Sequence, residues 1–157
     1  MNLIPSSATR VPDHTASSVN RSIADAARQR VEYFARHPAR IHDRLRELDE
    51  QWDVERLLEV NSSILSLAGL ALGLAFDRRW LALPLVVQSF FLMHAVEGWC
   101  PPLPVLRRMG VRTREEINAE RVALQALRGD FDQVRHGPGS QHDAAQRAFA
   151  AAAGSRA

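Results

Sequence analysis

The sequence predicts an all-α protein built around a two-helix transmembrane hairpin that is flanked by amphipathic cytoplasmic helices. Two apolar stretches, residues 57–76 and 80–98, are separated by only the three polar residues 77–79. At about 1.5 Å per helical residue, each stretch spans roughly 30 Å, the thickness of the hydrocarbon core of a bilayer. Trp52, Trp80 and Trp99 lie near the ends of these stretches, where membrane interfaces favour tryptophan. The alternative is a buried helical hairpin in a soluble bundle.

The composition limits the classes of protein to which the chain can belong. Its 157 residues suffice for one domain, and its 20 basic residues, all arginine, nearly balance 18 acidic ones. Both signs interleave in the flanks, which excludes a polybasic nucleic-acid-binding protein. The single cysteine excludes an internal disulfide framework and a multi-cysteine zinc site. Phosphate loops, Ser-His-Asp patterns and metal motifs are absent, so we predict neither a metal nor a cofactor.

The N-terminal flank divides into two predicted parts. Residues 1–20 have no apolar periodicity and no secretory signal, so we predict disorder there and expect the hairpin to act as the insertion signal. Residues 21–56 are predicted to form amphipathic helices, the first beginning at an N-cap on Ser22. The second, over 39–60, has an apolar seam and no breaker before the hairpin, so it is expected to continue into the membrane. Its acidic content favours packing against another helix over binding to the membrane surface. The seam consists of Ile41, Leu45, Leu48 and Trp52.

The C-terminal flank, residues 100–131, is predicted to be a proline-rich exit followed by a cytoplasmic helix. The prolines within 100–104 predict a non-helical exit from the membrane. Thr113 and Glu116 form a capping box for a helix that ends near Gly129. Residues 132–157 are predicted to be a mobile tail, with a weakly helical alanine-rich piece near 144–153.

Small side chains follow one face of the first arm. The spacing of Gly69 and Gly73 is the pattern that lets helix backbones approach closely in lipid. This face is expected either to pack against the second arm of the same chain or to drive self-association. Its predicted helix-packing residues are Ser62, Ser66, Gly69 and Gly73.

The candidate functional residues are His94, Glu97 and Cys100, which recur every three residues at the end of the second arm. Ionisable groups within a membrane are costly and often functional, so His94 is either a ligand or proton-handling residue or a neutral side chain bonded within the hairpin. Glu97 is expected to pair with Arg56 or Arg107. Cys100 is either an inert, half-buried thiol or a reactive one favoured by nearby arginines. No catalytic residue is predicted.

The distribution of arginine predicts the orientation. Eight arginines flank the hairpin within about 20 residues of its ends, against Arg78 and Arg79 in the turn. Positive loops are retained in the cytoplasm, so both termini are expected to be cytoplasmic, in a bacterial inner (plasma) membrane.

The segment from the first arm through residues 98–111, Gly-Trp-Cys-Pro-Pro-Leu-Pro-Val-Leu-Arg-Arg-Met-Gly-Val, resembles the YgaP-like transmembrane domain family. Members are small two-helix bacterial membrane modules of unknown function. Their signature is a glycine and a Cys-Pro pair that close the second helix, followed by a further glycine, here Gly98, Cys100, Pro101 and Gly110. Some relatives are fused to rhodanese sulfurtransferase domains, which implies a link to sulfur or redox handling.

Two functions remain open at this point. The first is a non-enzymatic membrane protein, in contact with the lipid bilayer, that docks a membrane-protein partner or forms a homo-oligomer through its flanking helices. The second is a thiol-dependent redox or sulfur carrier that uses Cys100.

Overall fold

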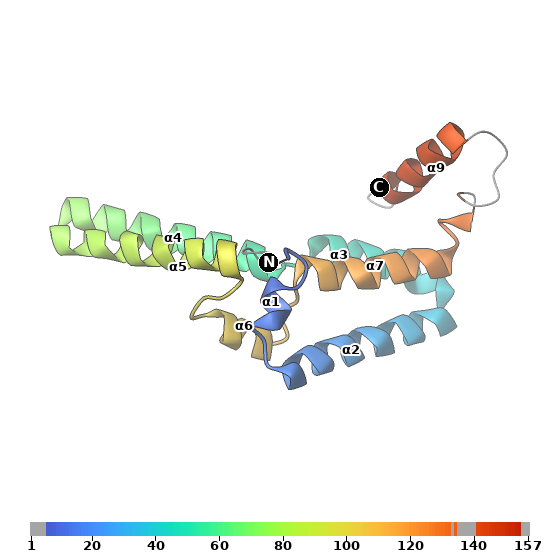
Figure 1. Ribbon diagram of the computed structural model, residues 1–157, viewed down its shortest axis with the longest axis horizontal. Helices are drawn as coiled ribbons and strands as arrows, with labels where there is room; N and C mark the ends of the chain where they lie inside the picture. Colours follow the sequence, from blue (N-terminus) through green and yellow to red (C-terminus); the bar gives the residue numbers. More distant parts are fainter. Residues whose placement is uncertain (1–5, 133, 135–140, 155–157) are drawn as a thin grey trace. The chain divides into compact units, whose positions relative to one another are not determined.

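The protein is all-helical in a computed structural model that describes residues 6–132, 134 and 141–154 (Figure 1). The described residues divide into two compact units, one from 6–24 and 52–115, the other from 25–51 and the described part of 116–154. The elements in chain order are α1 (Arg10–Asp13), α2 (Ser17–Arg36), η1 (Pro38–Arg40), α3 (Ile41–Glu50), α4 (Val54–Ala75), η2 (Arg78–Leu81), α5 (Ala82–Glu97), α6 (Leu103–Arg108), α7 (Arg114–Arg128) and α9 (Gln141–Gly154).

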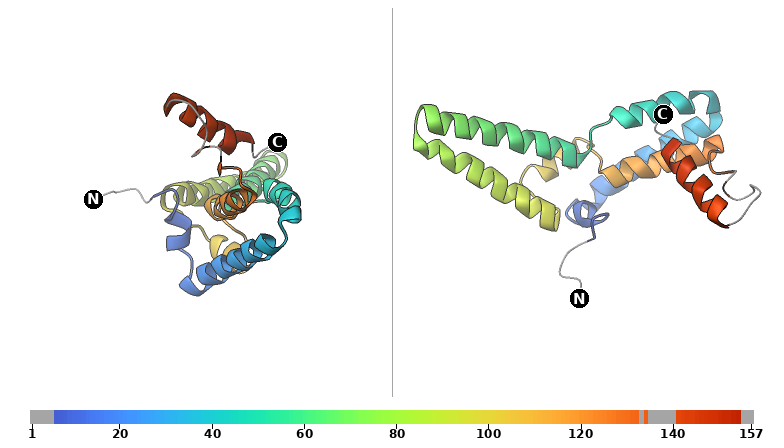
Figure 2. Two further views of the ribbon diagram at one scale, coloured as in Figure 1. Left: turned by 90° about the vertical axis from the view of Figure 1, so that its right-hand side faces the viewer. Right: turned by 90° about the horizontal axis from the view of Figure 1, so that it is seen from above.

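The first unit contains the predicted hairpin as an antiparallel pair, α4 and α5, joined by the short 3-10 helix η2 (Figure 2). We call α4, η2 and α5 the hairpin. The Asp77 carboxylate accepts a 2.8 Å hydrogen bond from the Arg79 backbone N–H and so caps η2. Two stretches, Pro38–Ala75 and Arg78–Glu97, contain windows long and apolar enough to cross a membrane. The observed helix bounds differ by only a few residues from the predicted arms.

The hairpin does not continue from α3 as the sequence predicted. Residues 51–53 are not helical, and Asp53 adopts an extended backbone before α4. Its carboxylate accepts a 2.7 Å hydrogen bond from the backbone N–H of Arg56, which satisfies one of the free donors of the first turn. The Val54 N–H donates to the Arg112 carbonyl, 3.0 Å away. The prediction of one continuous helix is therefore wrong, because an aspartate N-cap starts a second helix.

The first unit also has helices in two places where none was predicted. α1 and the start of α2 lie within residues 1–20, so the prediction of disorder is wrong for that part of the segment. α2 begins at Ser17, so Ser22 is not an N-cap. α6 begins directly after Pro102, and Pro104 lies in its first turn. Backbone N–H groups in the first turn have no partner within the helix, so the N–H that proline lacks is not missed there. The prolines of the exit therefore start a helix instead of preventing one.

The second unit is a cluster of three helices, which we call the helix trio: α2 from Asp25 onward, α3, and α7 from Glu116 onward. Its apolar core contains three of the four residues of the predicted seam. The fourth, Trp52, belongs to the first unit, is 43% exposed and lies under the Arg56 guanidinium, 4.5 Å from its ring centroid. α7 begins directly after Thr113, as the capping box predicted. The core consists of Ile41, Leu45, Leu48, Ile117 and Leu124, with Val31 and Phe34 packed against it.

The predicted mobile tail, residues 132–157, lies partly outside the described residues. Within it, the structure describes α9, which includes the alanine-rich piece and begins earlier than predicted, at Gln141.

Candidate functional site

The three candidate residues occupy different surroundings at the end of α5. His94 and Cys100 are buried, at 2% and 3% exposure, whereas Glu97 is exposed. Spacing by three residues keeps side chains on one face only while the helix continues. α5 ends at Glu97, so Cys100 leaves the helical register and enters a separate apolar cluster. The structure therefore does not assemble the three residues into one site.

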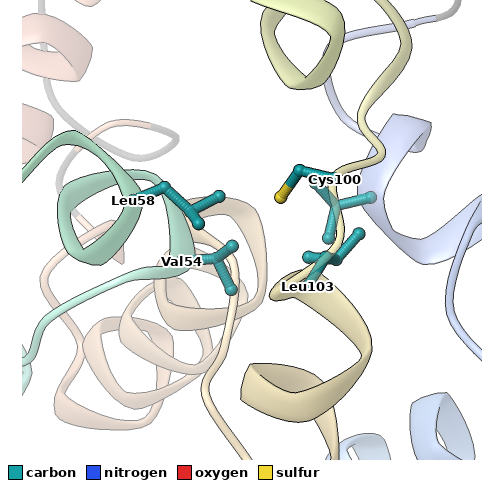
Figure 3. Packing of buried hydrophobic residues seen from close by; sticks show 5 residues of the cluster. Val54, Leu58, Cys100 and Leu103 are labelled. Carbon is teal, nitrogen blue, oxygen red and sulfur yellow. The ribbon is translucent and has the colours of Figure 1, made fainter. Parts of the chain in front are cut away.

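Cys100 packs inside the apolar core of the first unit. Its sulfur points toward Val54 and Leu58 of α4, and Leu103 of α6 lies beside it (Figure 3). Burial raises the pKa of the Cys100 thiol, and its backbone hydrogen bond with Leu103 only partly opposes this effect. Because the thiolate is the reactive form, this environment favours an unreactive, structural thiol. The arginines expected to favour the thiolate do not overcome the burial.

His94 is the most deeply buried residue of α5. Neither ring nitrogen has a hydrogen-bond partner among the described residues, so the expected bond to a carbonyl or serine is not formed. The neighbouring Ala95 carbonyl accepts a hydrogen bond from the Arg10 guanidinium of α1. The end of α5 is thus held by α1 through the Ala95 backbone carbonyl.

Glu97 does not make the predicted ion pair. It is exposed and has no ion-pair partner in the described part of the chain. Arg56 instead stacks on Trp52, and the Arg107 side chain is buried elsewhere in the first unit.

Gly98 closes α5 for a geometric reason. Its φ of +84° is the left-handed conformation that glycine adopts at helix C-caps, and its N–H donates to the His94 carbonyl. A Cβ at this position would lie 2.6 Å from the backbone carbonyl carbon and oxygen of Arg10. Gly110, the second glycine of the signature, also has a positive φ, +82°, after α6. Gly98 and Gly110 therefore allow the backbone to turn in the left-handed conformation after α5 and α6.

The predicted helix-packing face lies against α5 and η2 of the same chain. A Cβ on Gly69 would be 2.5 Å from Pro84 Cδ, and one on Gly73 would be 2.5 Å from a Leu81 methyl carbon. Further along, the Gln88 side-chain amide donates a 2.8 Å hydrogen bond to the Ser66 hydroxyl. Ser62 is buried, and its hydroxyl donates to the Glu59 carbonyl of its own helix, 3.1 Å away.

Sequence reasoning missed a buried arginine that joins α6 to the N-terminal segment. Arg107 is 1% exposed, and its guanidinium donates to Thr15 Oγ1, Asn20 Oδ1 and the Val111 carbonyl at 2.9–3.3 Å. Asn20 in turn donates to the Pro12 carbonyl at 2.8 Å. The contacts of Arg107 with Thr15 and Asn20 join residues 92 and 87 positions apart, so no local pattern predicts them.

A second missed network lies inside the helix trio. The Glu120 carboxylate of α7 has no exposed surface and forms ion pairs with Arg30 of α2 and Arg44 of α3, at 3.1 and 2.9 Å. We call these three residues the ion cluster. A buried carboxylate is tolerated when charged hydrogen bonds replace its hydration, and here those bonds join α7 to both α2 and α3.

No group of three or more His, Cys, Asp or Glu side chains in the described ranges is arranged to hold a metal ion. Comparison of the chain with protein families, with curated proteins and with solved structures gives no match.

Proposed function

We propose that the chain is an integral protein of the bacterial inner membrane, anchored by the hairpin, that docks a protein partner or a second copy without catalysing a reaction. The observation that carries the membrane part of the proposal is the exposed apolar surface of the hairpin. The resemblance to the YgaP-like transmembrane domain family agrees with this architecture and is part of the proposal.

The hairpin has the polarity that a lipid environment favours. Large apolar side chains on its outer surface are 59–81% exposed, whereas Gln88 and Ser66 bond to each other across the pair. Soluble monomers rarely expose apolar patches larger than a few hundred Å². A core helix of a soluble protein would be mostly buried, but only 22% and 6% of the two apolar windows are buried. The most exposed side chains are Ile64, Leu67, Leu74, Phe76, Leu85 and Leu92.

The lengths of the helices match a bilayer. α4 has 22 residues, about 33 Å, and η2 with α5 covers a similar distance on the return. In lipid, backbone polar groups need partners within the protein, and helices supply them. The orientation with both termini in the cytoplasm rests on the eight flanking arginines against two in the turn.

The docking role rests on the helix trio. Its apolar core and ion cluster hold three helices in a defined arrangement, while charged residues such as Asp43, Arg46 and Glu47 remain on the surface of α3. Such a surface suits a polar protein partner, because charge complementarity selects partners. The alternative, a redox or sulfur carrier, needs an accessible thiolate, and the burial of Cys100 disfavours one.

Alkaline carbonate extraction tests the membrane part. The protein should remain with the membrane pellet after washing, because a spanning hairpin is not released when peripheral contacts break. Recovery in the soluble fraction would contradict the proposal.

Site-directed cross-linking tests the docking part. In a Cys100→Ser background, Arg46→Cys on α3 should form specific cross-linked products in native membranes with a short thiol cross-linker. Leu67→Cys, on the outer surface of the hairpin, is the control and should give none. If Arg46→Cys and other exposed positions of the helix trio gave no product, the docking role would be wrong.

A third experiment tests the orientation. Met109→Cys, 73% exposed after α6, should react with a membrane-impermeant maleimide in inverted vesicles but not in intact spheroplasts. Labelling in spheroplasts would reverse the orientation.

A further inference from the structure

The two helices of the hairpin approach closely at one end and separate at the other. Near η2, the two glycines bring α4 against Pro84 and Leu81. Toward the opposite end the helices diverge (Figure 2), and large side chains replace the small ones. Leu58 of α4 and Phe91 of α5 face the apolar core there. This change from small to large side chains leaves space between the helices.

That space is an apolar cavity of about 220 Å³. The cavity is lined from α4 by Leu58, Asn61, Ser62 and Leu65, from α5 by Val87, Phe90 and Phe91, and from the segment after α5 by residues 100–102. An apolar cavity of about 150 Å³ holds a benzene ring, so this one accepts a ring or a short length of hydrocarbon chain. It is smaller than the roughly 300–1,000 Å³ of sites for drug-sized ligands. Its size and lining therefore favour a narrow, apolar ligand.

The mouth of the cavity lies on the outer surface of the hairpin. Leu65 and Phe90 line the cavity and are themselves 38% and 41% exposed. If the hairpin crosses the bilayer as proposed above, this surface faces lipid, and the molecules at the mouth are lipid acyl chains. The inference made here rests on that proposed function.

Asn61 adds a polar side chain to the α4 wall of the cavity, between Leu58 and Leu65. Its side chain is exposed, and its amide makes no hydrogen bond with any described residue. It lies four residues, about 6 Å, beyond Leu57, where the predicted apolar stretch begins. Side chains on a helix point toward its N-terminus, so the amide reaches toward the headgroup end of α4. At that level a glycerophospholipid presents its ester carbonyls, which accept hydrogen bonds.

We propose that this cavity binds one acyl chain of a membrane glycerophospholipid, with the Asn61 amide donating a hydrogen bond to the ester carbonyl of that chain. The cavity excludes the second chain and the headgroup by its size. From its carbonyl at Asn61, a bound chain runs toward Leu65 and Val87 in the space between α4 and α5, and residues 100–102 line the headgroup side of that carbonyl.

Native mass spectrometry of the full chain in mild detergent, with added dioleoylphosphatidylglycerol, tests this proposal. The wild-type chain should retain one phospholipid, and Val87→Trp should abolish retention because the indole fills the cavity. Val86→Trp is the matched control: Val86 is the adjacent valine, is half exposed and does not line the cavity. Retention should survive in this variant. Absence of lipid from the wild-type chain, or equal retention by both tryptophan variants, would overturn the proposal.

A second comparison tests the hydrogen bond without filling the cavity. The wild-type chain should retain the ester-linked lipid about fivefold better than its ether-linked analogue, which lacks the carbonyl. Asn61→Leu should lose this preference and still retain both lipids. If Asn61→Leu left the preference for the ester-linked lipid unchanged, the proposed hydrogen bond from Asn61 would be wrong.

Two further outcomes distinguish the lipid site from the proposed membrane role and from dimer formation through the cavity. Carbonate-resistant membrane association of the wild-type chain without retained lipid would refute the lipid site and leave the membrane role intact. A dimer that Val87→Trp dissociates, with no lipid bound to the wild-type chain, would assign the cavity to a side chain of a second copy.

Discussion

The hairpin and the helix trio place polar and apolar side chains in opposite ways. In the helix trio, leucine and isoleucine face inward, charged residues face outward, and the one fully buried carboxylate has two arginine partners. In the hairpin, leucine, valine and phenylalanine face outward, and the Gln88–Ser66 hydrogen bond joins the helices. The hydrophobic effect accounts for the first arrangement. Small-residue packing and interhelical hydrogen bonds are the interactions that hold helices together in lipid, so the second arrangement agrees with the membrane role proposed above.

The largest expected effect is on the helix trio. Glu120→Gln keeps the shape of the side chain but leaves two arginines facing a neutral amide, so it should lower the free energy of unfolding by about 3 kcal/mol. Chemical denaturation in detergent, followed by circular dichroism, measures this change. The control is Glu32→Gln, which removes an exposed pair with Arg36 and should change stability by less than about 0.5 kcal/mol. Equal effects of the two substitutions would show that the ion cluster does not stabilise the helix trio.

A smaller loss is expected in the hairpin. Gly69→Ile places a branched side chain where a Cβ alone would be 2.5 Å from Pro84 Cδ, and should destabilise helix packing by about 1–3 kcal/mol. Thermal unfolding in detergent measures it. Leu70→Ile, at a 45% exposed position one residue away, should have little effect. Similar damage from both would mean that the small-residue face is not where α4 meets α5.

The smallest expected effect is a shift in the pH dependence of the reaction of the Cys100 thiol with a maleimide. Burial disfavours the thiolate, so the maleimide reaction in detergent should rise with pH at a midpoint above that of a free cysteine, about 8.5. Met109→Cys in a Cys100→Ser background provides the exposed reference thiol. A midpoint at Cys100 below that of the reference would support the carrier function instead of docking.

The sequence predicted those parts of the fold that depend on local patterns. The long apolar runs and the charged turn at Asp77 identify the two hairpin helices, and the Thr113–Glu116 box marks the start of α7. Two other local signals in the sequence account for the helix starts that the predictions missed. Asp53 is a favoured N-cap residue, and prolines suit the first turn of a helix such as α6.

The parts that could not be predicted depend on contacts between distant residues. Glu120 looks like any charged residue of α7 until α2 and α3 bring Arg30 and Arg44 to it, 90 and 76 residues away in the chain. The regular spacing of His94, Glu97 and Cys100 suggested one face, but the turn at Gly98 breaks the register before Cys100. The cavity likewise depends on how far the two helices diverge, which no single helix encodes.

The most direct test of the contrast between the two regions is the accessibility of Leu67→Cys in native membranes, in the Cys100→Ser background. Leu67 is 67% exposed on the isolated chain, so in water its thiol would react readily with a charged maleimide. With the hairpin in a bilayer, it should react only after detergent solubilisation, whereas Arg46→Cys of the helix trio should react in inverted vesicles. Equal labelling of Leu67→Cys and Arg46→Cys before solubilisation would show that the hairpin faces water.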